Sequence, residues 1–107
     1  MEEVLNLDSE FLKPIKDGLE LSINVLTKNA LLTKKEAEIT LKINIGVEQR
    51  FKQEKKWLEP KIEYQINDKI KEAKSSYKND IGYNYKIELD DDNNIIVQNL
   101  SEQTSLF

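Results

Sequence analysis

The sequence predicts an α+β domain in which one N-terminal helix packs on a three- to four-stranded antiparallel meander. Two observations predict this class. Apolar residues recur at helical spacing early in the chain, and apolar and polar residues alternate strictly in later segments. With 107 residues and 38% hydrophobic content, the chain has apolar residues for one modest core. We therefore expect a single domain over residues 1–98, followed by a flexible tail over residues 99–107.

The helix is expected between about residue 10 and Asn29, which is a plausible C-terminal stop. Its apolar stripe is made of Phe11, Ile15, Leu19, Ile23 and Leu26, widened by Leu12. Asp8 or Ser9 is a candidate cap at its start. Pro14 is compatible with the helix only within the first turn, because proline lacks the N–H that later positions need.

A half-buried strand is expected in "KKEAEITLKINIGVEQRF", where one face carries Ala37, Ile39, Leu41, Ile43, Ile45 and Val47. A connection rich in Lys and Glu follows and ends at Pro60. Within it, Trp57 is interpreted as a lid over the open end of the core, and an exposed contact point is the alternative.

A second strand is expected after Pro60, with Ile62, Tyr64, Ile66 and Ile70 on one face. Beyond residue 68 a strand is favoured, although helical spacing also fits as far as Tyr77. A hairpin is expected in "YKIELDDDNNIIV", with its turn at Asp90 to Asn94. The three aspartates favour a turn rather than a calcium site, because their spacing lacks the alternate-position ligands, the central Gly and the distal Glu of a calcium loop.

The chain contains neither Cys nor His. This excludes disulfides, thiolate zinc sites and cysteine nucleophiles, and it removes the commonest general base. The three glycines are scattered, so no phosphate-binding loop is present. We expect a protein that is not an enzyme, with no catalytic residue, metal site or cofactor.

The charge pattern argues against strong binding to nucleic acid, because the net charge is -4 and the pI about 4.9. Residues 50–78 are nevertheless basic, and the chain from Asn79 onward is acidic. Solvated strand faces explain this distribution most simply, and weak nucleic-acid contact through the basic segment is the alternative.

The N-terminus is acidic and no apolar run reaches transmembrane length, so we expect a cytoplasmic protein without a membrane partner. An exposed edge strand in so small a meander would allow a symmetric homodimer.

The last seven residues, "SEQTSLF", end on two large apolar side chains, Leu106 and Phe107. They either pack on the core of their own chain or act as a short linear motif. In the second case Gln103 would hydrogen-bond at the rim of a pocket on a partner, Ser105 would fix the backbone, and Leu106 and Phe107 would fill an apolar hole.

The pentapeptide from Gln103 to Phe107, "QTSLF", resembles the bacterial sliding-clamp-binding motif, in which a Gln is followed by any residue, then Ser or Asp, then Leu and Phe. Every specified position of that motif matches. The resemblance implies that Gln103, Leu106 and Phe107 are the principal contacts with the clamp and that Ser105 supports them.

The order of segments in the rest of the chain is similar to that of small phage and prophage proteins of Gram-positive bacteria, described as replication-associated or replication-terminator-like. The resemblance rests on "KKEAEITLKINI", "PKIEYQI" and "YKIELDDDNNIIV" after the N-terminal helix. It implies a non-enzymatic accessory protein in the cytoplasm of a bacterial host that docks on the sliding clamp and modulates or accompanies DNA replication. The alternative is a phage-encoded inhibitor of a host defence or nucleic-acid enzyme, whose acidic surface imitates DNA.

Overall fold

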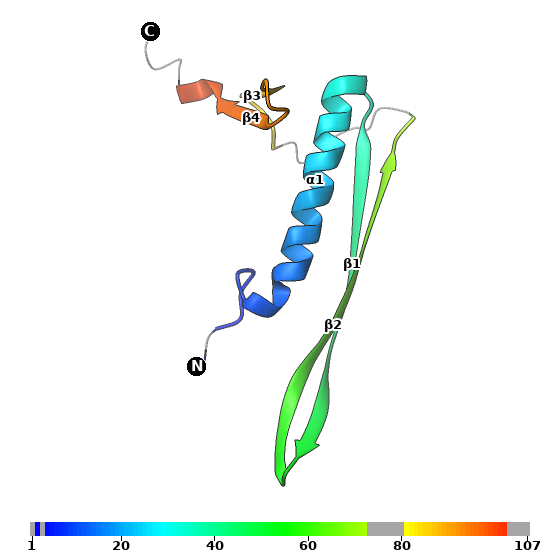
Figure 1. Ribbon diagram of the computed structural model, residues 1–107, viewed down its shortest axis with the longest axis vertical. Coiled ribbons are helices and arrows are strands. Elements are labelled where there is room, and N and C mark those ends of the chain that lie inside the picture. The colour runs from blue at the N-terminus through cyan, green and yellow to red at the C-terminus, as the bar shows by residue number, and fades with distance from the viewer. Residues whose placement is uncertain (1, 3, 73–80, 103–107) are drawn as a thin grey trace.

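The computed structural model describes residues 2, 4–72 and 81–102, and it confirms the α+β class (Figure 1). A 3-10 turn, η1 (Glu10–Leu12), leads into the helix α1 (Lys13–Thr33). The strands β1 (Ala37–Lys52) and β2 (Lys55–Ile70) form one antiparallel hairpin, and β3 (Tyr85–Leu89) and β4 (Ile95–Asn99) form another. A second 3-10 turn, η2 (Leu100–Glu102), follows β4. The antiparallel strands are thus divided between two two-stranded sheets, both in contact with α1.

The start of α1 agrees with the constraint that proline imposes, because Pro14 lies in the first turn. Ser9 is the residue before η1, but its side chain makes no capping bond to that turn. Instead the Asn6 N–H donates to Ser9 Oγ at 3.1 Å, and Lys16 Nζ donates to Asp8 Oδ1 at 2.6 Å. The two predicted cap residues therefore stabilise the approach to the helix rather than its first N–H groups.

The expected helix stop at Asn29 is wrong, because α1 continues to Thr33. The residues after Asn29 are "ALLT", and Ala and Leu are strong helix formers. Thr33 Oγ1 donates back to the Asn29 carbonyl at 2.8 Å. Lys34 caps the end of the helix, because its φ of 63° is left-handed and its N–H donates to the Ala30 carbonyl.

The expected connection that contains Phe51 and Trp57 and ends at Pro60 is also wrong, because both strands pair through it. The register runs without interruption from Ala37 opposite Ile70 to Lys52 opposite Lys55. A two-residue turn joins the strands, and its residues Gln53 and Glu54 have φ values of 51° and 65°. Two consecutive positive φ values are the signature of the type I′ turn, which matches the twist of a hairpin.

Pro60 lies within β2, opposite Val47, rather than at the start of the strand as expected. A two-stranded sheet leaves each strand one open edge, where the missing N–H of a proline removes no ladder bond. The predicted strand is confirmed as far as Ile70, where β2 ends. Of the segment 68–78, for which a helix is the alternative, residues 73–78 lie outside the described residues.

The predicted β3–β4 hairpin and its turn are confirmed. Asp90 and Asn94 close the turn, since the Asp90 N–H donates to the Asn94 carbonyl at 3.0 Å. Asp90 Oδ1 also accepts hydrogen bonds from the N–H groups of Asp92, at 2.9 Å, and Asn94, at 2.8 Å. Asn93 takes the left-handed conformation with φ of 64°, which Asn tolerates well.

The molecule is elongated, because the β1–β2 hairpin extends well past the N-terminal end of α1 (Figure 1). Its longest dimension is 67 Å, and its radius of gyration is 19.8 Å. A compact domain of this length has a radius of gyration of about 13 Å. Much of the chain therefore lies far from any shared core.

Candidate interaction surface

The predicted clamp-binding residues, Gln103, Ser105, Leu106 and Phe107, lie outside the described residues, as do the last five residues of the predicted tail. The segment just before them is well tied to the β3–β4 hairpin. The Leu100 N–H donates to the Asn84 carbonyl at 2.9 Å, and Ser101 Oγ donates to Asn99 Oδ1 at 2.6 Å. The motif therefore begins directly after a turn that is anchored to the fold.

The β1–β2 hairpin has one apolar face and one polar face, because the register places odd positions of β1 opposite even positions of β2. The apolar face carries Ala37, Ile39, Leu41, Ile43, Ile45, Val47 and Phe51 from β1, and Leu58, Pro60, Ile62, Tyr64, Ile66 and Ile70 from β2.

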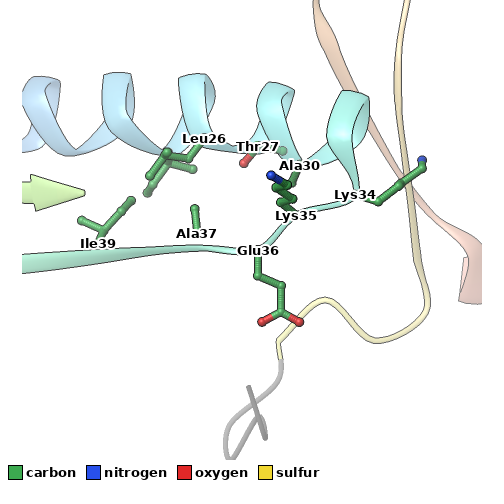
Figure 2. Close-up of a pocket in the computed structure, with 9 residues that line it drawn as sticks. Leu26, Thr27, Ala30, Lys34, Lys35, Glu36, Ala37 and Ile39 are labelled. Carbon is green, nitrogen blue, oxygen red and sulfur yellow. The ribbon is translucent and has the colours of Figure 1, made fainter. Parts of the chain in front are cut away.

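The helix covers the part of this face nearest the β1 start. Figure 2 shows Leu26 of α1 and Ile39 of β1 pointing toward each other across a shallow pocket, while Glu36 points away from it. Farther along, a groove between the two elements is lined by Ile15, Leu19 and Ile23 together with Leu41 and Ile43. The contacts between helix and hairpin therefore extend to about the middle of β1.

Beyond that point the apolar face has no cover in the described part of the chain. We call this segment the hairpin arm, residues 45–62. Ile45 is 78% exposed, Val47 68% and Leu58 68%. Side chains of this kind on a face shared by two strands form a continuous apolar patch, which in soluble proteins marks an interaction site.

The described residues also contain no fully buried hydrophobic side chain. Ser9 is buried, at 3% exposure, whereas even the helix-facing Leu41, Ile43 and Tyr64 keep more than a third of their surface exposed. A core this thin contributes little of the apolar burial on which folding depends.

The interpretation of Trp57 as a lid is wrong. Trp57 lies opposite Arg50, on the polar face of the hairpin arm, away from the side that α1 covers. It is 44% exposed. A lid is expected only if the segment around Trp57 is a connection. Because Trp57 belongs to a strand, the alternation places its side chain on the opposite face from Val47 and Leu58.

Ion pairs offset part of the positive charge on the arm. Arg50 Nε lies 3.1 Å from Glu59 Oε2 and Arg50 Nη2 lies 3.6 Å from Glu48 Oε2, which Lys61 Nζ also approaches at 3.3 Å. These groups are exposed, so the pairs add little stability. They do fix the charged groups of Arg50, Glu59 and Lys61 on the polar face, and these three residues belong to the basic segment 50–78, for which weak nucleic-acid contact is the alternative.

Among the described acidic residues of the C-terminal third, Asp90, Asp91 and Asp92 lie together at the β3–β4 turn rather than along a stripe. Asp90 is engaged in the turn itself, and Lys86 Nζ lies 3.7 Å from Glu88 Oε2. This arrangement does not favour imitation of the regular charge spacing of DNA. Among the described residues, no group of carboxylates is placed to hold a metal ion.

The sequence does not reveal the hairpin arm as a surface, because the alternation does not give the full length of β1 and β2. A 16-residue strand spans about 53 Å, whereas a 21-residue helix spans about 32 Å, so a helix cannot cover such a strand along its length. The strict alternation that predicts the first strand is clear only as far as Glu48, so this difference in length is not visible in the sequence.

No helix in the described ranges has both the length and the apolar character needed to cross a membrane. Comparison with protein-family models, with curated proteins and with solved structures finds no match for this chain.

Proposed function

We propose that the protein is a non-enzymatic phage or prophage accessory protein that docks on the bacterial sliding clamp through Gln103 to Phe107. The observation that carries the proposal is the match of "QTSLF" to every specified position of the clamp-binding pentapeptide. Docking would bring the α+β domain to replicating DNA or would displace host proteins from the same pocket, and in either case it would modulate replication.

The fold supports such a role by the way it holds the residues before the motif. Hydrogen bonds from Leu100 to Asn84 and from Ser101 to Asn99 join η2 to the β3–β4 hairpin. A partner that bound Gln103 to Phe107 would therefore hold the β3–β4 hairpin only a few residues away. Affinity would come from Leu106 and Phe107 in an apolar pocket of the clamp, and hydrogen bonds of the Gln103 amide would fix the orientation of the motif in that pocket.

The test is equilibrium binding of the full chain to purified bacterial sliding clamp. A short motif that orders on binding is expected to give a Kd on the order of micromolar. The double variant Leu106→Ala with Phe107→Ala should lose binding. Leu5→Ala with Leu7→Ala is the matched control, because it removes two exposed leucines elsewhere in the chain and should bind as the wild type does.

A peptide with the sequence of residues 99–107 should compete with the full chain for the clamp. If the wild type does not bind, or if the Leu106 and Phe107 variant binds equally well, the proposal fails. Competition by the peptide with no effect of the double alanine variant would also contradict the assigned contacts.

A further inference from the structure

The hairpin arm lacks a partner in the described chain, and the area that the chain exposes is far above that of a compact monomer. The solvent-accessible surface is 9879 Å². A compact protein of 12.5 kDa exposes about 6,200 Å². The excess is roughly 3,700 Å² for one chain, and an obligate homodimer buries about 1,000–2,500 Å² on each copy.

We propose that a second copy of this chain covers the apolar face of the hairpin arm, and that the arm of each copy lies along α1 of the other. The surface involved is distinct from the Gln103 to Phe107 motif. It also differs from pairing of edge strands, since it uses the face of the hairpin rather than its backbone edges.

The helix offers an apolar flank on which such an arm can lie. Leu21, Val25 and Leu32 fall on one stripe at 3.6 residues per turn, on the side of the helix roughly opposite the flank that carries Leu19 and Leu26 toward the hairpin. All three are more than half exposed. The lengths also agree, because eight residues of the arm span about 26 Å and α1 spans about 32 Å.

The charges of the two surfaces are complementary. The end of the hairpin arm and its turn carry Arg50, Lys52, Lys55, Lys56 and Lys61 against Glu48, Glu54 and Glu59. The described residues up to residue 20 carry Glu2, Asp8, Glu10, Asp17 and Glu20 against Lys13 and Lys16. Asp17 precedes Leu21 by one helical turn, and Lys56 shares the arm's apolar face with Phe51. Opposite net charge on the hairpin arm and on the N-terminal half of the partner's helix favours contact between the two.

The arrangement closes on itself. If the arm of one copy lies on the helix of its partner, a two-fold axis places the partner's arm on the first helix, so the arm and the helix flank of each copy are both covered. A chain with so little buried apolar surface of its own would then obtain its core from the dimer.

The first test is sedimentation of the full chain over a series of concentrations. The wild type should be a dimer, and Val47→Gln with Leu58→Gln should weaken dimerisation by more than about 100-fold, because each copy loses two apolar side chains from the contact. Trp57→Gln is the matched control: it makes the same kind of change on the opposite face of the arm and should leave the dimer intact. Leu106→Ala with Phe107→Ala should also remain dimeric.

A wild type that sediments as a monomer throughout would overturn the proposal, and so would a Trp57→Gln variant that dissociates as readily as the Val47 and Leu58 variant. The other possible occupant is residues 103–107 of the same chain. In that case the wild type would be monomeric and a chain ending at Glu102 would self-associate, which likewise overturns the proposal.

The second test does not depend on loss of folding, and it uses the absence of native cysteine. An equimolar mixture of Val47→Cys and Leu21→Cys chains should form a mixed disulfide dimer under mild oxidation. A mixture of Trp57→Cys and Leu21→Cys should not. Preferential disulfide formation between two Val47→Cys chains would mean that the two arms contact each other, and it would overturn the proposal that each arm lies on α1 of its partner.

Discussion

Gly18 of α1 lies against Ile66 of β2 so closely that a Cβ atom built on Gly18 would stand 3.1 Å from Ile66 Cδ1. The ring carbon Tyr64 Cε2 would be 3.9 Å away. Both neighbours are side-chain atoms, and Ile66 Cδ1 is the end of its side chain. The helix therefore meets the hairpin at a contact that can adjust by a few tenths of an ångström.

Replacement of Gly18 by Ala should stabilise the fold. Glycine within a helix costs about 0.5–1 kcal/mol relative to alanine, because its unfolded backbone is more mobile. Displacement of the Ile66 methyl group takes back a part of this gain, so we expect a net increase of about 0.5 kcal/mol in the free energy of unfolding. Urea unfolding followed by circular dichroism measures it.

The same substitution in an Ile66→Ala background separates the two contributions. With the methyl group removed, Gly18→Ala should yield the full gain of about 1 kcal/mol. A loss of stability in the wild-type background combined with a gain in the Ile66→Ala background would mean that Ile66 cannot move, contrary to the expectation.

The turn of the β1–β2 hairpin should accept better turn residues. Gln53 and Glu54 hold positive φ angles that Asn and Gly adopt at lower cost. Gln53→Asn with Glu54→Gly should therefore raise the free energy of unfolding by about 1 kcal/mol. Glu54→Gln alone controls for the loss of charge and should change stability little. Equal stability of the double variant and the wild type would contradict the assigned turn.

Gln53 and Glu54 also explain why the sequence does not predict the far half of the β1–β2 hairpin. The alternation that predicts a strand is clear from Ala37 to Val47, and it predicted the face that α1 covers. Gln53 and Glu54 carry no turn signal, and the residues beside them are charged, so the pattern resembled a connection. Pairing of Lys52 with Lys55 is decided by backbone geometry across the turn, which residue types alone do not report.

The helix shows a similar division. Pro14 limits where α1 can begin, and the apolar spacing predicts which flank meets the hairpin. Its end is set by Lys34 in a left-handed conformation, which Lys adopts rarely and which no local pattern indicates. The exposed arm could not be predicted either, because it results from the difference in length between one helix and two strands.

The pair of Asp8 and Lys16 should be visible in the titration of Asp8. The hydrogen bond from Lys16 Nζ and its positive charge lower the pKa of Asp8 from its ordinary 3.8, and Asp8 in turn raises the pKa of Lys16 above 10.5. NMR titration should give an Asp8 midpoint below 3.8, and Lys16→Met should return the midpoint toward that value.

The signs of the two shifts define the pH range in which this pair acts. The contribution of Asp8 to stability is present above its ordinary pKa and is lost as the pH falls through its lowered pKa. The contribution of Lys16 is present below its ordinary pKa and is lost as the pH rises through its raised pKa. Both side chains are exposed, so added salt should move the Asp8 midpoint back toward 3.8. A midpoint independent of salt would contradict this account.

Asp90 should matter for the β3–β4 hairpin far more than its neighbour Asp91. Asp90 Oδ1 accepts two backbone N–H groups, from Asp92 and Asn94, and it holds the turn in place. Asp90→Ala removes both bonds and should cost about 1–2 kcal/mol in the opening of this hairpin. Asp91→Ala removes the same charge from an exposed position and should stay within about 0.5 kcal/mol of the wild type. Amide hydrogen exchange across Ile95 to Asn99 measures both effects, and equal exchange in the two variants would mean that charge rather than these two bonds stabilises the turn.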